Sequence, residues 1–149
     1  MSVIGFIPSR FSSTRFPGKP LVNIAGKAMI QRVYEQASKA SSLSEVYVAT
    51  DNQNIFDHVL NFGGNAIMTS QHHKSGTDRC MEAAELINKE CNVIINIQGD
   101  EPFVDPAQID ELVACFDDDT VQLATLIKKI DNWKDIFNEN RPKVIVDKQ

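Results

Sequence analysis

The segment 9–19, SRFSSTRFPGK, carries three cations and four hydroxyl groups within eleven residues and contains no carboxylate to pair with them. The cations are Arg10, Arg15 and Lys19. An arginine guanidinium makes two-pronged contacts with phosphate oxygens, and a lysine supplies a movable positive charge. Because the segment directly follows an apolar run at residues 3–8, which predicts a buried strand, we interpret it as a phosphate-binding loop. It lacks the early glycine of the G-x-x-x-x-G-K-S/T P-loop, and a solvated basic surface loop is the alternative.

The segment 97–102, IQGDEP, follows the run NVIIN at residues 92–96, which has the clearest strand pattern in the chain. Asp100 comes where this strand ends, and Gly99 allows a ligand or the backbone to approach closely. A carboxylate that faces a polyphosphate is typical of a Mg²⁺ site, where carboxylates, phosphates and water share the ion. We therefore predict Asp100 as a Mg²⁺ ligand beside the cationic loop. The alternative is an aspartate turn that caps its own backbone.

The segment 72–79, HHKSGTDR, combines donors and acceptors that could read the edge of a nucleobase. Ser75 and Asp78 resemble a capping box at the start of a helix, and a capped helix with a polar entry loop is the alternative. Arg79, in the first helical turn, could reach a phosphate or brace the loop. The adjacent histidines do not favour a zinc site, because neighbouring residues cannot easily face one ion. Asp51, after another strand pattern, is predicted to cap a helix.

These segments need a scaffold that brings them together, and the hydropathy pattern predicts one. Apolar runs at 3–8, 45–49, 65–68 and 92–96 predict strands, and 123–130 and 143–146 predict two more. Amphipathic patterns predict helices at 29–37, from Asp51 to 62, from Ser75 to about 89, from 106 onward and near 133–137. Alternation of such strands and helices predicts an α/β fold with a mainly parallel sheet covered on both faces. Ligands bind such sheets beyond the carboxyl ends of the strands.

Composition narrows the class of protein. The chain has 149 residues, a length that suggests one domain, and a net charge of −5, which disfavours nucleic-acid and anionic-membrane partners. The first 34 residues hold five basic and no acidic side chains, while the other residues carry ten basic and twenty acidic ones, so the basic segment is expected to face an anion. No apolar run is long enough to cross a membrane. Three cysteines without C-x-x-C spacing fit a reducing cytoplasm.

Four ordered motifs resemble the N-terminal portion of the 3-deoxy-manno-octulosonate cytidylyltransferase family, also called CMP-Kdo synthetases. They are IPSRFSSTRFPGKPL at 7–21, ATD at 49–51, HKSGTDR at 73–79 and QGDEP at 98–102. The later segment 137–147, FNENRPKVIVD, is similar to the family too, so the resemblance covers essentially the whole chain. Ser9 stands where the family usually has alanine, and Phe16 where it usually has leucine. Neither difference removes a charge.

The resemblance implies an enzyme that transfers CMP from CTP to the sugar acid Kdo, releases pyrophosphate and uses Mg²⁺. It implies a nucleotide-diphospho-sugar-transferase-like α/β fold, a homodimer, and a role in lipopolysaccharide synthesis in the bacterial cytoplasm. The family's chains continue well beyond this length and there supply a second metal carboxylate and most sugar contacts. We therefore predict that residues 1–149 form a single nucleotide-binding α/β domain that lacks the family's C-terminal third.

Carried onto matching positions, the resemblance assigns roles to individual residues. Arg10, Lys19 and Asp100 are the expected catalytic residues, with Asp100 as the Mg²⁺ ligand. The residues expected to bind CTP are Arg10, Arg15, Lys19, Ser75, Gly76, Thr77, Arg79 and Gln98. Another nucleotidylyltransferase of the same fold, with a different acceptor, is one alternative. A truncated nucleotide-binding module without activity is another.

Overall fold

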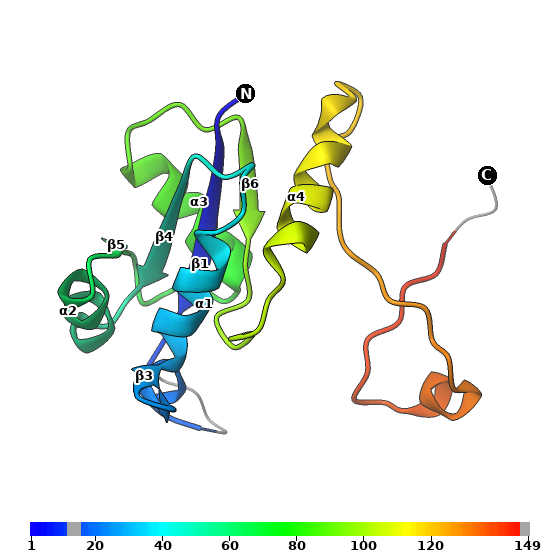
Figure 1. The fold of residues 1–149 in the computed structure, drawn as a ribbon, viewed down its shortest axis with the longest axis horizontal. Helices are drawn as coiled ribbons and strands as arrows, with labels where there is room; N and C mark the ends of the chain where they lie inside the picture. The colour runs from blue at the N-terminus through cyan, green and yellow to red at the C-terminus, as the bar shows by residue number, and fades with distance from the viewer. Residues whose placement is uncertain (12–15, 147–149) are drawn as a thin grey trace.

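The centre of the molecule is a four-stranded parallel sheet with the strand order β5-β4-β1-β6, shown in Figure 1. It is seen in a computed structural model that describes residues 1–11 and 16–146. The elements are β1 (Val3–Ser9), the 3-10 helix η1 (Lys19–Leu21), β2 (Asn23–Ile24), β3 (Lys27–Ala28), α1 (Met29–Ala37), β4 (Glu45–Thr50), α2 (Gln53–Asn61), β5 (Asn65–Met68), α3 (Gly76–Leu86), β6 (Val93–Asn96), α4 (Pro106–Ala114), and the 3-10 helices η2 (Cys115–Asp117) and η3 (Trp133–Phe137). The four strands of the sheet agree with the predicted ranges to within one residue at each end.

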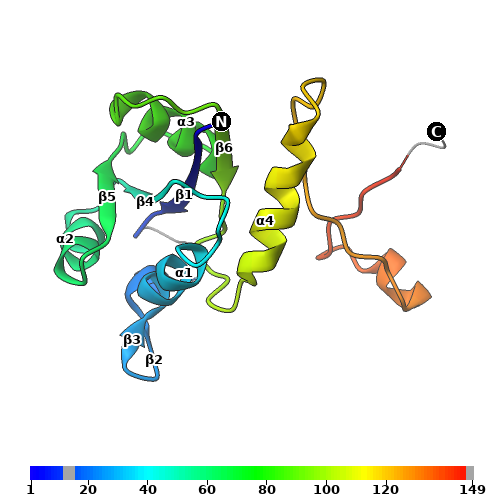
Figure 2. The same ribbon diagram turned by 45° about the horizontal axis from the view of Figure 1, so that its top comes forward.

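The side chains of β1 alternate between two apolar cores, one on each face of the sheet. Val3 and Ile7 belong to a core that also contains buried residues of α1, α2 and α4. Ile4 and Phe6 belong to a second core, closed by α3. Figure 2 shows α3 on the opposite side of the sheet from α1. Because both faces are covered, the strands are continuously apolar, and the predicted α/β class is confirmed. None of the helices in the described ranges has the length and hydropathy to cross a membrane.

The predicted helix starts at Met29, after Ser75 and at Pro106 agree with the structure, whereas the predicted cap of α2 is wrong. The Ser75 hydroxyl accepts a hydrogen bond from the Asp78 amide at 3.1 Å, and the Asp105 carboxylate accepts one from the Ala107 amide at 3.0 Å. The prediction that Asp51 caps α2 is wrong, because Asn52 holds that position and accepts from two amides of the first turn. The Asp51 carboxylate is used elsewhere, as described below. Helix α3 ends at Leu86, short of the predicted 89.

The two predicted strands at 123–130 and 143–146 are wrong. These segments have no regular secondary structure, and most of their residues are exposed. A strand needs a neighbour whose amides and carbonyls complete its hydrogen bonds, and neither segment is paired with the sheet. The short helix near 133–137 is confirmed as η3. Figure 1 shows this whole region standing apart from the sheet beyond α4.

Helix α4 is tied to the turn before β4 by one carboxylate. Asp110 accepts hydrogen bonds from the hydroxyl and amide of Ser42, at 2.6 and 2.9 Å, and from those of Ser41, at 3.0 and 3.2 Å. These four donors, those of Ser42 first, lower the pKa of Asp110 from 3.8 to about 2. The contact holds the middle of the helix that follows the 97–105 loop, so it helps to position that loop.

This carboxylate makes stability depend on acid in a defined direction. Its folded pKa lies below the unfolded value, so its contribution is fully present above about pH 4 and is lost as the pH falls toward 2. We expect Asp110→Asn to be less stable than the parent protein at pH 6, with the difference shrinking between pH 4 and 2. Urea unfolding at a series of pH values measures this. A difference that stays constant down to pH 2 would contradict the assignment.

Candidate active site

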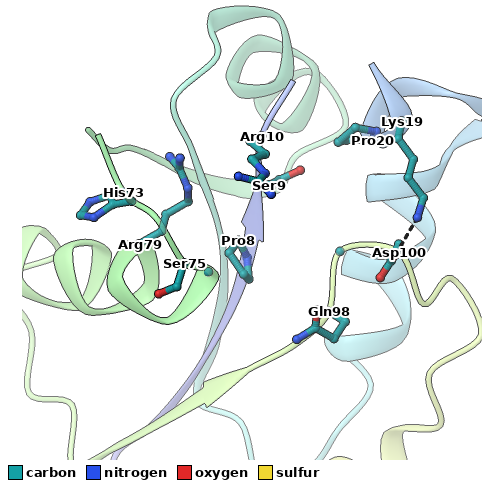
Figure 3. Close-up of a pocket in the computed structure, with 12 residues that line it drawn as sticks. Pro8, Ser9, Arg10, Lys19, Pro20, His73, Ser75, Arg79, Gln98 and Asp100 are labelled. Atoms are coloured by element: carbon teal, nitrogen blue, oxygen red, sulfur yellow. Dashed lines mark hydrogen bonds and ion pairs between the residues drawn. The ribbon is translucent and has the colours of Figure 1, made fainter. Parts of the chain in front are cut away.

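A cavity of about 330 Å³ lies at the carboxyl ends of β1 and β6, next to the start of α3, as Figure 3 shows. This is the edge at which open parallel sheets bind ligands. The cavity is lined by Pro8, Ser9, Arg10, Lys19, Pro20, His73, Ser75, Gly76, Arg79, Gln98, Gly99 and Asp100. Seven of the nine predicted site residues are among them, although they come from three separate parts of the chain.

The cationic loop and the acidic loop meet directly. The Lys19 ammonium lies 2.6 Å from a carboxylate oxygen of Asp100, although the two residues are 81 positions apart. Their side chains are 38% and 51% exposed. An ion pair this exposed contributes little to stability and can open for a ligand at small cost. The prediction that Asp100 lies beside the cationic loop is confirmed for Lys19, and the strand that precedes Asp100, β6, lies at the edge of the sheet.

The end of β1 supplies the middle of the cavity wall. In Figure 3 the side chains of Ser9 and Arg10 lie between the α3 side and the side that holds Lys19 and Asp100. Ser9 is buried, and its hydroxyl has no hydrogen-bond partner among residues 1–11 and 16–146. The sequence placed Ser9 among the hydroxyl groups of the predicted phosphate-binding loop but did not single it out as a site residue. Arg15 lies outside the described residues, so its predicted phosphate contact stays a prediction.

Two glycines allow the segments around the cavity to approach Pro8 closely. A Cβ atom at Gly99 would lie 3.1 Å from the Pro8 carbonyl oxygen. A Cβ atom at Gly76 would lie 3.1 Å from the Pro8 ring. A side chain at either position would therefore push the β6 loop or the start of α3 away from β1. The absence of side chains here keeps the Asp100 loop and the α3 N-terminus against the same strand end.

The start of α3 forms the other wall. Ser75 and Gly76 line the cavity, and Gln98 lines it from the end of β6. Thr77 is exposed on the first helical turn and is not one of the lining residues. Free amides at the start of an α-helix favour a negatively charged neighbour. Of the residues of this segment predicted to bind CTP, Ser75, Gly76 and Arg79 therefore line the cavity, while Thr77 is exposed.

Arg79 lines the cavity, but its guanidinium is bound by two residues that do not line it. Only 3% of the residue is exposed, and its guanidinium lies 2.8 Å from the Asp51 carboxylate and 2.5 Å from the Thr69 hydroxyl. Asp51 follows β4 and Thr69 follows β5, so the guanidinium joins α3 to two strand ends. Of the two roles considered for Arg79, the brace is the one its contacts support. No sequence signal pairs Asp51 with Arg79.

A second anchor of the same loop was missed at the sequence level. The Glu82 carboxylate lies 2.5 Å from the His73 ring nitrogen Nε2 and accepts a hydrogen bond from the Ser70 amide at 2.8 Å. The His73 hydrogen bond, followed by that of Ser70, lowers the pKa of Glu82 below its usual range. Glu82 lies within none of the four motifs, and only its three-residue spacing from Arg79 on a helix could have drawn attention to it.

Comparisons with known proteins agree with this geometry. The 3-deoxy-manno-octulosonate cytidylyltransferase of Cytophaga hutchinsonii is 52% identical over 146 residues, which are 98% of this chain and 58% of that protein. The enzyme of the same name from Phocaeicola vulgatus is 51% identical over 151 residues, 99% of this chain and 59% of that protein. This chain thus spans less than two thirds of the length of these curated relatives.

Solved structures give the same picture. CMP:2-keto-3-deoxy-manno-octonic acid synthetase, complexed with CTP, superposes with a TM-score of 0.77 at 43% identity, over 81% of this chain and 50% of that one. A cytidylyltransferase from Leptospira borgpetersenii superposes with a TM-score of 0.66 at 26% identity, over 78% of this chain and 49% of that one. A family model described as cytidylyltransferase matches residues 4–149. The chain therefore belongs to the cytidylyltransferase family.

Proposed function

We propose that the protein carrying this chain transfers CMP from CTP to Kdo and releases pyrophosphate. One observation carries the proposal: a single cavity at the carboxyl edge of the sheet brings Arg10, Lys19 and Asp100 together. Two cations beside a carboxylate suit a metal-bound triphosphate. The choice of CTP and Kdo is supported by relatives named for this reaction, at about half identity along nearly the whole chain.

The residues of the cavity divide into groups by what they can contact. Arg10 and Lys19 would contact the triphosphate, joined by Arg15 from outside the described residues. The α3 start, with Ser75 and Gly76, would lie at the cytosine and ribose. Gln98 would lie between nucleotide and sugar. The Ser9 hydroxyl in the cavity wall has no hydrogen-bond partner within residues 1–11 and 16–146, which supports a polar ligand, because a buried hydroxyl without a partner is costly.

The residues present fit a Mg²⁺ ion held mainly by its substrate. Asp100 offers one exposed carboxylate in the cavity, and residues 1–11 and 16–146 contain no group of three or more metal-binding side chains. Mg²⁺ in nucleotide enzymes is commonly bound by one or two carboxylates together with phosphates and water. Asp100 would be the protein ligand from this chain, and the ion would offset negative charge on the phosphates.

The chemistry needs alignment more than covalent help from the protein. The anomeric hydroxyl oxygen of the sugar would form a bond to the α-phosphorus of CTP and lose its proton to solvent, and the bond from that phosphorus to the bridging oxygen of pyrophosphate would break. Arg10 and Lys19 would hold the phosphates and stabilise the charge that grows on the leaving pyrophosphate. Lys19 must exchange Asp100 for phosphate, and the exposure of that ion pair makes the exchange inexpensive.

The proposal extends to the setting of the enzyme. Kdo activation serves lipopolysaccharide synthesis, so we place the protein in the cytoplasm, as a homodimer, without nucleic-acid or membrane partners. The reaction, the metal requirement and the dimer are properties of the protein as a whole, and each can be tested separately.

The test is pyrophosphate release by the protein that carries this chain. We expect release with CTP, Kdo and Mg²⁺, and far less when UTP replaces CTP. Neuraminic acid, methylerythritol phosphate and sugar 1-phosphates serve as competing acceptors. Release with one of these instead of Kdo would identify a different nucleotidylyltransferase. Calorimetric binding of CTP without release for any acceptor would identify a nucleotide-binding module, and the absence of CTP binding would overturn the proposal.

The role of Asp100 predicts a change in metal dependence. We expect Asp100→Asn to raise the Mg²⁺ concentration for half-maximal pyrophosphate release by about tenfold or more, because a neutral amide is a weaker ligand for a hard cation. Glu101→Gln is the matched control, since Glu101 is the adjacent carboxylate and does not line the cavity. Equal Mg²⁺ titrations for the two variants would remove Asp100 from the metal site.

A further inference from the structure

Glu82 lies in the second turn of α3, outside the cavity, and joins two points of the loop that enters it. One of its oxygens, Oε2, accepts both the Ser70 amide at 2.8 Å and the His73 ring nitrogen Nε2 at 2.5 Å. The side chains of His73 and Glu82 are only 20% and 29% exposed. A single oxygen therefore fixes both ends of the four-residue turn 70–73.

This turn determines where the cavity wall lies. It connects the end of β5 to the residues His73, Ser75 and Gly76, which line the cavity. Its first residue neighbours Thr69, whose hydroxyl is held by Arg79. Within the described part of the chain, Glu82 is the only hydrogen-bond partner of the His73 ring. Without Glu82 the His73 ring would lose its one hydrogen bond to the described residues. The segment 69–73 would then be held to α3 only by the Arg79–Thr69 contact among those residues.

The chemistry of the pair also fixes the state of the ring. A carboxylate oxygen can only accept hydrogen bonds, so the Nε2 atom of His73 must carry a hydrogen. In the neutral ring this leaves Nδ1 as an acceptor. The depressed pKa of Glu82, due first to His73 and then to Ser70, agrees with a carboxylate that is charged at neutral pH. Orientation and tautomer of His73 are thus set by a residue that no motif includes.

We propose that Glu82 is a positioning residue of the nucleotide pocket, which acts through His73 and the 70–73 turn to hold the start of α3 against the bound nucleotide. The inference rests on the proposed function for the identity of the ligand. The anchoring of the 70–73 turn by Glu82 is independent of the proposed function and can be measured in the protein without ligand.

The test compares CTP binding, by calorimetry with Mg²⁺, among three variants of one helix. We expect Glu82→Ala to weaken CTP binding by about tenfold, because small displacements of positioning groups are costly. Glu82→Gln retains an amide oxygen that can accept from both donors and should restore most of the affinity. Glu85→Ala is the matched control, because Glu85 is an exposed glutamate on the same helix and makes no side-chain hydrogen bond or ion pair with the described residues. In turnover assays Glu82→Ala should raise KM for CTP and leave kcat nearly unchanged.

A spectroscopic measurement separates positioning from general stability. The parent protein should show a protected Nε2–H signal of His73 by NMR, and this signal should vanish in Glu82→Ala. The amides of residues 70–73 should then exchange faster, while those of β1 and β4 should not. In His73→Ala, the further change of Glu82 to alanine should weaken CTP binding less than in the parent protein.

The outcomes distinguish the two proposals. Parent-like CTP affinity in Glu82→Ala, or an equal loss in Glu85→Ala, overturns the positioning role. If the parent protein fails to bind CTP, the proposed function is overturned. In that case an unchanged His73 signal and unchanged amide exchange in Glu82→Ala would overturn the anchoring as well, and their loss would support it.

Discussion

Replacing Lys19 by alanine should lower the rate of pyrophosphate release by about 10²–10³-fold, the usual effect of removing one group that stabilises transition-state charge. The ammonium of Lys19 lies at the cavity wall, 2.6 Å from Asp100, so it is already where a metal-bound triphosphate would sit. In the proposed reaction its charge would matter most when pyrophosphate departs. We therefore expect a large fall in kcat, measured by coupled pyrophosphate detection under saturating CTP and Kdo.

A control is offered by Lys27, which forms a second exposed lysine–carboxylate ion pair in the N-terminal part of the chain. Lys27 lies 2.7 Å from Glu35, is similarly exposed and does not line the cavity. Lys27→Ala should therefore leave turnover unchanged. Lys19→Ala also frees Asp100 from its ion pair, so the Mg²⁺ concentration for half-maximal release should not rise as it does in Asp100→Asn. Turnover in Lys19→Ala equal to that in Lys27→Ala would refute the assigned role.

Removing Asp51 should lower the free energy of unfolding by about 3–5 kcal/mol, because it leaves a buried guanidinium without its counter-charge. The side chains of Arg79 and Asp51 are only 4% and 12% exposed, and their atoms lie 2.8 Å apart. The hydrogen bond that Arg79 keeps within the described residues goes to the Thr69 hydroxyl, which is neutral and cannot replace the carboxylate. Urea unfolding of Asp51→Ala, followed by circular dichroism, measures the loss.

Two further variants test the physical cause. When Arg79→Met is combined with Asp51→Ala, the double variant should lose less unfolding free energy than the two single variants lose in sum. The reason is that no unpaired charge remains buried in the double variant. Lys27→Ala, which breaks an exposed ion pair, should cost far less than Asp51→Ala. If Asp51→Ala and Lys27→Ala unfold at the same urea concentration, the Asp51–Arg79 pair is not the brace described.

The two predictions concern opposite kinds of ion pair within one site. The pair of Lys19 and Asp100 is exposed and held by little else, which suits groups that must separate when a metal and a phosphate arrive. The pair of Asp51 and Arg79 is buried and joined to a third group, which suits a fixed support. Exposure, and not distance, distinguishes them, since both contacts are short.

Much of the site could be predicted because it lies next to elements that are encoded locally. The buried runs that became β1 and β6 are continuous and apolar, and in a parallel sheet their carboxyl ends must lie at one edge. Arg10, Lys19 and Asp100 follow those runs, so their convergence in one cavity could be inferred before any coordinates. The Ser75 cap could be inferred too, because a side chain three residues before an amide suffices to form it.

Other features depend on contacts between distant parts of the chain. Asp51 was expected to cap a helix, yet its neighbour Asn52 does so, and the choice depends on Arg79 lying opposite. The anchoring of His73 by Glu82 was not expected at all. The predicted strands at 123–130 and 143–146 failed for the same reason, since an apolar pattern does not state which sheet edge, if any, will supply hydrogen bonds.

The amino-acid sequence by itself determined the parallel α/β scaffold and the edge at which its charged loops gather, because hydropathy period and chain order are local properties. Only the tertiary structure decided which charged groups are partners, how deeply each pair is buried, and which apolar segments join the sheet. Those outcomes depend on distances and exposure across the fold, and no spacing along the chain specifies them.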